Sequence, residues 1–439
     1  MPHLPTLILQ IVVILAAARA VGFLFRRIHQ PQVVGEMVAG ILIGPSLLGW
    51  VAPDVSAALF PPASLGFLNA ISQIGVLAFM FVVGLEINPQ LLKGRGHTAV
   101  VTSHASIVFP FFLGSILALY LYPLLSDDSV SFTSFALFIG VAMSITAFPV
   151  LARILTERGL LRHPVGVVAI ACAAVDDVTA WCLLAAVVVI ARAGEGVFPI
   201  WVTVVGSGLF ALIMFFIVRP ALRSLETVFR RRGRMTQNLL ALVLLMVFAS
   251  AWVTEYLGIH ALFGAFLLGA VMPKEPEFVK ALTDRTEDLV VVLFLPLFFA
   301  FTGLRTSISM VSGSDMWTFC LLIIGVAVLG KLGGSMLAAR FTGMGWREST
   351  AIGILMNTRG LIELVVLNIG LDIGVISPAL FTMMVLMALV TTFMTTPLLA
   401  IVYPRRVLEK ELVAIEASGT QALNLKSEIS NLKSSEGLP

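Results

Sequence analysis

ACAAVDDVTAW, residues 171–181, places two adjacent carboxylates, Asp176 and Asp177, near the middle of an apolar segment that extends from about residue 164 to 192. A segment of this length matches a transmembrane helix, which needs about 20 apolar residues to cross about 30 Å of hydrocarbon. An ionised carboxylate at the centre of a bilayer costs at least about 2.5–3.5 kcal/mol. We therefore expect the pair to serve a function; the alternative is a pair that polar neighbours merely tolerate.

The rest of the chain has the composition of a membrane protein. Its 439 residues are 59% hydrophobic and only 12% charged, about half the charge of an ordinary soluble domain. The apolar residues form blocks of about 17–28 residues, so we predict an all-α, polytopic membrane protein with about thirteen transmembrane helices. The expected helices cover about 4–25, 33–50, 67–87, 97–122, 131–155, 164–192, 198–218, 237–257, 259–273, 288–305, 316–340, 347–373 and 378–402.

Basic residues are concentrated in alternate connections between these helices. Arg26 and Arg27 follow the first helix and a basic run from Arg219 to Arg234 follows the seventh, whereas acidic residues such as Asp54 occupy the opposite side. The positive-inside rule then predicts an N-terminus outside and a C-terminus in the cytoplasm, most simply in a cell or inner membrane. Because no basic residue precedes the first apolar segment, we expect a retained helix and not a signal peptide.

An internal repeat divides the expected transmembrane domain, residues 1–405, which a short charged cytoplasmic tail at 406–439 follows. FMFVVGLEIN at 79–88 resembles FFAFTGLRTS at 298–307 when Gly84 is aligned with Gly303. The first motif ends a helix at the inner side and the second at the outer side. Two inverted units, helices 1–6 and 8–13 joined by helix 7, explain this pattern.

Polar and helix-breaking residues interrupt the fifth and the twelfth expected helix, which occupy corresponding places in the two units. Unwound segments expose free carbonyl groups and helix dipoles, so paired interruptions indicate an ion or substrate site in mid-membrane. The interrupting residues are Thr146, Ala147 and Pro149 in the first unit and Thr358, Arg359 and Gly360 in the second.

The two aspartates suggest a chemistry for that site. Adjacent carboxylates repel each other, so at least one of them should be able to hold a proton. A carboxylate that binds either a proton or an alkali cation can exchange the two if it faces one side of the membrane at a time. Lys331, in the middle of the eleventh expected helix, is the natural cationic partner of one aspartate; alternatively its long side chain reaches the membrane surface.

Arg359 and Glu363 are four residues apart and share one helical face if the helix is continuous there. A structural ion pair is the first interpretation, and direct participation in a cation path is the second. Glu36 and Glu86 lie nearer the ends of their segments, where a packing or interfacial role is the simpler expectation.

Several classes of function fit poorly. Cys172, Cys182 and Cys320 lack metal-ligand spacing, and no basic face with interleaved aromatic residues indicates a nucleic acid partner. An intramembrane aspartyl protease needs its aspartates on separate helices, so we expect no enzyme, no catalytic residue and no cofactor. No repeated selectivity filter of a channel is evident. A sensor or an exporter built on the same fold stays open as an alternative.

Three motifs resemble the monovalent cation/proton antiporter-2 family, which includes bacterial sodium/proton exchangers, glutathione-gated potassium efflux systems and plant cation/proton exchangers. The resemblance covers essentially residues 1–405, and its most specific pieces are SITAFPVLARIL at 144–155, AAVDDVTAW at 173–181 and MNTRGLIELVVLNIG at 356–370.

The resemblance implies a homodimer whose six-helix core, with two crossed broken helices, moves like an elevator against a dimerisation domain. It implies that Asp177 binds the monovalent cation, that Asp176 is its neighbour in the charge-moving members, and that Lys331 pairs with an aspartate. We expect protons and sodium or potassium ions as the transported partners, with Thr146 beside the aspartates. The glutathione-gated systems carry a C-terminal nucleotide-binding domain that we do not find in this sequence, which argues against gated potassium efflux.

Overall fold

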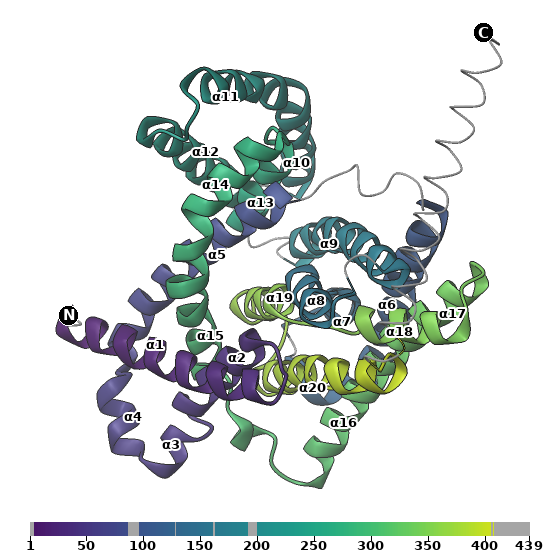
Figure 1. Ribbon diagram of the computed structural model, residues 1–439. Coiled ribbons are helices and arrows are strands. Elements are labelled where there is room, and N and C mark those ends of the chain that lie inside the picture. The colour runs from purple at the N-terminus through teal and green to yellow at the C-terminus, as the bar shows by residue number, and fades with distance from the viewer. Residues whose placement is uncertain are drawn as a thin grey trace, which may run out of the picture.

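The computed structural model describes residues 4–86, 96–127, 129–160, 163–191, 200–404 and 407 of the chain, and within these residues every regular element is a helix. Figure 1 shows their arrangement. The first half contains α1 (Leu4–Arg27), α2 (Gln32–Ile43), α3 (Leu48–Val51), α4 (Pro53–Leu59), α5 (Pro62–Glu86), α6 (Gly96–Leu125), α7 (Phe132–Ser144), α8 (Phe148–Arg158) and α9 (Pro164–Ala191). The linking segment contains α10 (Ile200–Ile213), the π-helical turn η2 (Met214–Val218) and α11 (Arg219–Arg232).

The second half begins at α12 (Gln237–Tyr256) and contains α13 (Ala261–Val271), α14 (Pro276–Leu289), η3 (Val290–Phe294), α15 (Leu295–Leu304) and η4 (Ile308–Met310). It continues with α16 (Ser314–Val328), η5 (Leu329–Gly333), α17 (Gly334–Phe341), α18 (Trp346–Met356), α19 (Leu361–Asp372) and α20 (Pro378–Val402). The tail predicted for 406–439 lies outside the described residues apart from Val407.

The prediction of an all-α membrane protein is confirmed, and every expected segment contains a helix. Among the described residues, eleven helical segments are long and apolar enough to cross a membrane, and α18 with α19, bent by 43°, form a twelfth. The ninth expected span corresponds to α13, which has only 11 residues. The count of thirteen is therefore approximate, because it depends on whether this short apolar helix is counted.

Two expected boundaries differ for local reasons. The second expected helix continued to residue 50, but α2 ends at Ile43 because Gly44 is extended (φ −84°, ψ −170°) before Pro45, as residues before proline prefer. The tenth expected helix begins at about residue 288, whereas the helical segment of the structure begins at Pro276. Glu275 is its N-cap residue, and the Glu275 side chain accepts a hydrogen bond from the Phe278 amide. An amphipathic helix thus continues directly into the membrane span.

The helix contacts repeat between the two halves. In each half the first membrane span packs on the second: α1 packs on α2, and α12 packs on α13. The second span of each half also packs on the third span of the other half, so that α2 contacts α15 and α13 contacts α5. Glycines make both cross-contacts close: a Cβ on Gly303 would lie 2.1 Å from the Gly40 carbonyl carbon, and one on Gly84 would lie 2.2 Å from the Phe266 carbonyl oxygen. This reciprocal pairing is what inverted repeats require.

Lys274 closes the contact between α5 and α13 at one end. Its Nζ donates to the carbonyl oxygens of Gly84, Leu85 and Gly269 at 2.8–2.9 Å, groups that the ends of helices leave without an intrahelical partner. Burial, helped by the positive charge of Arg219, lowers the pKa of Lys274 to about 7. The contact between α5 and α13 therefore contains a buried amino group whose charged form is disfavoured by the loss of contact with water.

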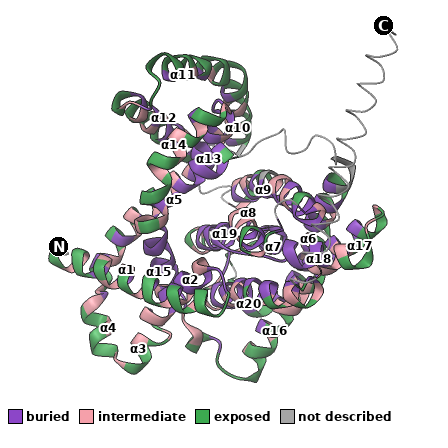
Figure 2. Cartoon of the chain, in the orientation of Figure 1, coloured by how far each residue is buried: buried purple, intermediate pink, exposed green. Residues whose placement is uncertain are grey.

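The remaining helices form a second group around α7 and α19. α6 packs on α7, α9, α16 and α17, while α20 packs on α16, α18 and α19. Every residue from Leu361 to Gly370 of α19 is buried, as expected for a helix that is apolar on all sides and surrounded by protein. Figure 2 shows the burial of α7 and α19 inside this group and the exposed faces of α1, α11 and α16 at the periphery. We call the first set of helices, α1, α2, α5 and α12–α15, the frame, and α6–α9 with α16–α20 the core.

Candidate functional site

Two broken helices meet in the middle of the core. Residues 145–147 separate α7 from α8, and residues 357–360 separate α18 from α19. The Ala147 amide donates to the Thr358 carbonyl oxygen at 3.0 Å, so the two breaks contact each other directly. Thr146 and Ala147 lie in the first break and Thr358, Arg359 and Gly360 in the second, whereas Pro149 lies in the first turn of α8, where proline is tolerated. Four helix ends with their dipoles therefore converge on one point.

Asp176 lies beside this point with both carboxylate oxygens satisfied. Ser103 of α6 donates to Oδ1 at 2.5 Å and Ser106 to Oδ2 at 2.5 Å, and Thr146 also donates to Oδ2 at 2.9 Å. Lys331 Nζ forms an ion pair with Oδ2 at 3.0 Å, and both side chains have 0% exposure. The three hydroxyls and the ammonium make Asp176 a buried but fully hydrogen-bonded carboxylate, the condition under which a charge is tolerated away from water.

Lys331 thus points into the core and not to the membrane surface. It belongs to the π-helical turn η5, a wide turn that is frequent at functional sites. Its Nζ also donates to Thr146 Oγ1 at 2.6 Å. The adjacent Gly330 allows this approach, because a Cβ there would lie 2.8 Å from Pro110 Cα of α6. Lys331, Thr146 and Asp176 consequently form one triangle across three separate segments.

Asp177 is the contrasting member of the pair. It is 2% exposed, and its Oδ1 has no hydrogen-bond partner among the described residues. An unsatisfied buried polar atom is costly, and a proton on Asp177 or a bound cation would remove that cost. No group of three or more His, Cys, Asp or Glu side chains able to hold a metal ion occurs in the described part of the chain.

Arg359 and Glu363 form the ion pair expected from their spacing, at 2.8 Å and with 0% exposure of both side chains. Arg359 does more than pair: its Nη atoms donate to the carbonyl oxygens of Ala142 and Met143 at 2.8 and 2.7 Å. These are carbonyls of the last turn of α7, which no helical amide satisfies. Arg359 is thus a C-terminal cap of the first broken helix, supplied by the second break.

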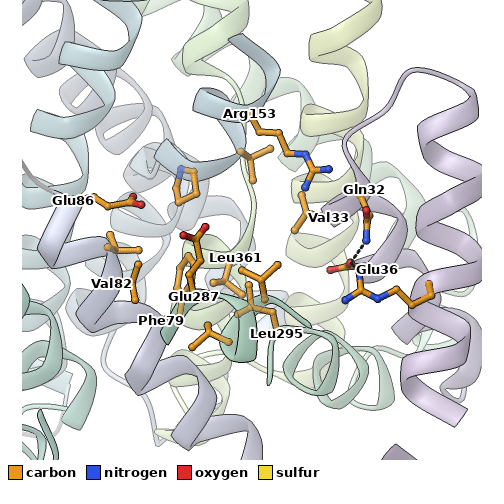
Figure 3. Close-up of a pocket in the computed structure, with 16 residues that line it drawn as sticks. Gln32, Val33, Glu36, Phe79, Val82, Glu86, Arg153, Glu287, Leu295 and Leu361 are labelled. Atoms are coloured by element: carbon orange, nitrogen blue, oxygen red, sulfur yellow. Dashed lines mark hydrogen bonds and ion pairs between the residues drawn. The ribbon is translucent and has the colours of Figure 1, made fainter. Parts of the chain in front are cut away.

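A cavity of about 310 Å³ lies between the frame and the core and approaches the crossing. Pro149 and Val150 of α8 and Leu361 of α19, all in the first turns after the breaks, contribute to its wall. Figure 3 shows side chains from the frame and the core facing each other across it. The cavity therefore extends from Glu86, the last residue of α5, to the first turns after the two breaks.

Charged side chains line this cavity from both sides. The carboxylates are Glu36, Glu86 and Glu287. Two guanidinium groups accompany them: Arg153 faces them from α8 (Figure 3), and Arg19 Nη1 on α1 lies 4.0 Å from Glu36 Oε1. Glu36 accepts a hydrogen bond from Gln32 at 2.8 Å. Glu36 and Glu86, for which packing was the simpler expectation, thus border an accessible acidic cavity. With three carboxylates and two guanidinium groups, the lining carries a small excess of acidic side chains, which favours cations over anions only slightly.

Some site residues were not recognised in the sequence. Ser103 and Ser106 were missed, although their three-residue spacing inside an apolar segment places both hydroxyls on one helical face. Glu287 was missed because it lies within the polar, amphipathic segment 276–289, where an acidic residue is expected at the surface. The partner of Lys331 could not be chosen from sequence, because Asp176 and Asp177 point about 100° apart on one helix.

Comparisons with known proteins agree with the geometry. A family model described as sodium/hydrogen exchanger, transmembrane, matches residues 11–402. The Na(+)/H(+) antiporter NhaS4 of Synechocystis sp. is 44% identical over 395 residues, which cover 90% of this chain and 96% of that protein. Cation/H(+) antiporter 17 of Arabidopsis thaliana is 44% identical over 91% of this chain, and K(+)/H(+) antiporter 1 of Saccharomyces cerevisiae is 35% identical over 90%.

The chain spans about half the length of these two eukaryotic relatives, 48% and 46% respectively. Among solved structures, the sodium proton antiporter MjNhaP1 from Methanocaldococcus jannaschii superposes with a TM-score of 0.61 at 17% identity, over 97% of this chain and 98% of that one. At this identity the structural likeness concerns the fold.

Proposed function

This chain belongs to the sodium/hydrogen exchanger family, and from that premise we propose that it is a multi-pass membrane antiporter that exchanges protons for a monovalent cation. The names of its relatives support this directly, since they describe Na(+)/H(+), K(+)/H(+) and cation/H(+) antiporters. The family is one of transporters, and the proposal concerns movement of ions, not catalysis of a reaction.

The observation that carries the proposal is the difference between the two adjacent aspartates. Both carboxylate oxygens of Asp176 are bonded by Lys331 and three hydroxyls, whereas Asp177 Oδ1 has no hydrogen-bond partner in the described part of the chain. We assign Asp177 as the carboxylate that binds either the cation or a proton. Either ligand neutralises a buried charge, so the two compete for one place and exchange follows from that competition.

Asp176, Lys331 and Thr146 act in the proposal as the positioning group. A cation at Asp177, the neighbour of Asp176 in the chain, would compete with Lys331 for the negative charge of the aspartate pair and so weaken the ion pair between Lys331 and Asp176. Loss of the cation restores the ion pair. The occupancy of Asp177 is thereby linked to the contacts of Lys331 with α9 and with the first break.

Alternating access requires the site to face one side at a time. The acidic cavity between frame and core reaches the first turns of α8 and α19 from one end, and we infer that ions approach the site along it. Movement of the core against the frame, in the manner of an elevator, would close this route and open another. We further propose a homodimer with its N-terminus outside and its C-terminus in the cytoplasm, as the distribution of basic residues predicts.

Exchange in liposomes tests the proposal. Purified protein is reconstituted with a pH gradient across the membrane, and collapse of the gradient is followed after addition of sodium, potassium, lithium or choline chloride. We expect an alkali cation, but not choline, to collapse the gradient. Asp177→Asn should abolish the response, whereas Asp315→Asn, at an exposed acidic residue in the first turn of α16, should leave it intact.

The cation that gives the response also decides between sodium and potassium, which the mixed names of the relatives leave open. A correctly folded protein that responds to no alkali cation would contradict antiport and favour the alternative of a sensor or an exporter. A full response in Asp177→Asn would contradict the assignment of the exchange carboxylate while leaving antiport intact.

A further inference from the structure

An ion pair joins the frame to the core at a distance from the acidic cavity. Arg305, the residue that follows α15, contacts Asp372, the last residue of α19, through Nη2 and Oδ1 at 2.6 Å. Arg305 Nη1 also donates to Asn368 Oδ1 at 3.0 Å. Both side chains of the ion pair are partly exposed. A single frame residue therefore holds two side chains of one core helix.

The lengths of α15 and α19 place this contact on the far side of the crossing from the acidic cavity. Leu295 begins α15 and Leu361 begins α19, and both residues line that cavity. Arg305 and Asp372 lie at the opposite ends of these two helices, about 15 Å further along at a rise of 1.5 Å per residue. The frame and the core are thus separated by a cavity at one end of their interface and joined through Arg305 at the other.

Two further hydrogen bonds cross the interface near Arg305. Asn368 Nδ2 on α19 donates to Thr302 Oγ1 on α15 at 2.9 Å, and the Ser307 amide of the frame donates to Thr382 Oγ1 on α20 at 3.3 Å. Thr302 and Thr382 are both buried. These contacts have to separate whenever the core moves against the frame, and a partly exposed ion pair can separate readily because it contributes little stability.

The internal repeat places Glu86 in the first unit where Arg305 lies in the second. Gly84 and Gly303 are counterparts, and a charged residue follows each of them two positions later. Since α8 and α19 are counterparts as well, Glu86 is expected to lie toward α8 as Arg305 lies toward α19. The basic residue of α8 that lines the acidic cavity together with Glu86 is Arg153 (Figure 3). The signs of the charges on frame and core are thus exchanged between the two ends.

Arg153 and Glu86 are available for a new contact. Arg153 Nε pairs with Glu157 of its own helix at 3.1 Å, in an exposed pair that costs little to break. Glu86 is exposed at the end of α5. Glu36, another frame carboxylate of this cavity, already accepts a hydrogen bond from Gln32 and lies 4.0 Å from an arginine of α1. The repeat and these contacts both favour Glu86 as the partner of Arg153.

We propose that Arg305 is a gate residue of the exchanger. Its contact with Asp372 holds the core in the position that leaves the acidic cavity open. Release of this contact lets the core shift until Arg153 pairs with Glu86, which closes the cavity and opens the other end of the interface. The inference rests on the antiport proposed above, and it identifies the residues that decide from which side the site is accessible.

Reaction of a buried cysteine in the purified full-length protein tests the gate without relying on transport. Thr382→Cys is the probe, in a background in which serine replaces the three native cysteines, Cys172, Cys182 and Cys320. Position 382 is 0% exposed, so its rate of reaction with a charged methanethiosulfonate measures the fraction of molecules that are open at the Arg305 end. Arg340→Gln is the matched control, because Arg340 donates to Met344 and lies over the Trp346 ring, both within the core.

We expect Arg305→Gln to raise the rate at least about tenfold, because the ion pair and the charged hydrogen bond to Asn368 are both lost. Asp372→Asn should raise it about two- to fivefold, since the bond to Asn368 remains, and Arg340→Gln should leave it unchanged. Adding either Arg153→Gln or Glu86→Gln to Arg305→Gln should lower the raised rate about two- to fivefold, because the pair that stabilises the shifted core is lost.

An unchanged rate in Arg305→Gln and Asp372→Asn, or an equal rise in Arg340→Gln, would overturn the gate. A rise that neither Arg153→Gln nor Glu86→Gln lowers would overturn the reciprocal pair, because it indicates local loosening at the end of α15. Exchange in liposomes, measured on the same variants, separates this inference from the proposed function. The expected shifts in a protein that exchanges no cation would contradict antiport while supporting control of the core by Arg305.

Discussion

Replacing Arg359 with glutamine should destabilise the protein more than replacing Glu363, although the two side chains form one buried ion pair. Arg359→Gln removes three charge-assisted hydrogen bonds, to Glu363 at 2.8 Å and to the carbonyls of Ala142 and Met143 at 2.8 and 2.7 Å. It also leaves the Glu363 carboxylate buried without its partner. Breaking a buried pair in this way costs about 3–5 kcal/mol.

Glu363→Gln weakens only one of those bonds, because it removes the negative charge of the acceptor but leaves an amide oxygen that can still accept a hydrogen bond from Arg359. Arg359 keeps both carbonyls of α7 and remains at the negative end of that helix dipole, which stabilises a cation there by up to about 2 kcal/mol. We therefore expect a loss of about 1.5–3 kcal/mol, the value of one hydrogen bond to a charged group. The two variants should differ because Arg359 donates both to Glu363 and to the carbonyls at the end of α7, whereas the bond of Glu363 is the one to Arg359.

Unfolding of the purified variants in mixed micelles of mild detergent and dodecyl sulfate measures these losses. Asp372→Asn is a suitable control, because Asp372 pairs with Arg305 at 2.6 Å but is 35% exposed, and such partly exposed pairs contribute only about 0–1 kcal/mol. A loss in Glu363→Gln equal to or larger than that in Arg359→Gln would refute the capping argument. Loss of exchange in a well-folded Glu363→Gln would move this pair into the cation path.

Three further substitutions test other parts of the structure. Lys331→Met should reduce cation-dependent exchange by at least about tenfold. It also leaves the Asp176 carboxylate buried without its cation, which costs up to about 3–5 kcal/mol, partly offset by the three hydroxyls that still hold Asp176 at about 1 kcal/mol each; unchanged exchange by the correctly folded variant in liposomes would contradict its role. Gly303→Ala should lower thermal stability by about 1–3 kcal/mol, because the added Cβ meets backbone at 2.1 Å, whereas Gly325→Ala, in open space within a helix, should be neutral or stabilising. Lys274, with its pKa lowered to about 7, binds fewer protons in the folded than in the unfolded state above that pH, so stability should rise between about pH 7 and 10; this rise, followed by thermal unfolding, should be absent in Lys274→Met.

The overall architecture followed from sequence because the bilayer imposes few solutions. Blocks of apolar residues long enough to cross the hydrocarbon must be helices, and each expected block contains one. The alignment of Gly84 with Gly303 also indicated the repeat, and the structure explains why glycine stands at both places: each lies against the backbone of another helix, at Phe266 and Gly40. A glycine that permits close packing leaves a signal in the sequence, since no other residue can replace it there.

Contacts between segments that are distant in the sequence could not be predicted from the sequence in the same way. Burial of two aspartates is evident from their apolar surroundings, but the helix rotation that turns Asp176 toward Lys331 is set by packing of α6, α9 and η5 together. Ser103 and Ser106 illustrate the difficulty. A serine inside a membrane helix commonly bonds to its own helix backbone, so its sequence position does not show that it faces a carboxylate.

The two broken helices are alike in sequence position but differ in how their ends are satisfied, and this difference has a consequence for coupling. The end of α7 is held by Arg359, a permanently charged group with several rigid donors. The end of α18 is contacted instead by Thr146, whose Oγ1 lies 3.2 Å from the Met356 carbonyl oxygen. Thr146 has one proton to donate, and with Lys331 donating to it at 2.6 Å, that proton goes to Asp176 at 2.9 Å.

If Lys331 releases its proton or moves from Asp176, Thr146 can turn its proton to the Met356 carbonyl. The second helix end would then gain a cap at the moment when the ion pair is lost. The end of α7 is therefore capped by the guanidinium of Arg359. The end of α18 is contacted by the hydroxyl of Thr146, which has two alternative acceptors, Asp176 and the Met356 carbonyl. Among the described residues, Thr146 of the first break joins Asp176 to the end of α18, so the exchange of ligand that we propose at Asp177 would act on the end of α18 before it acts on the end of α7.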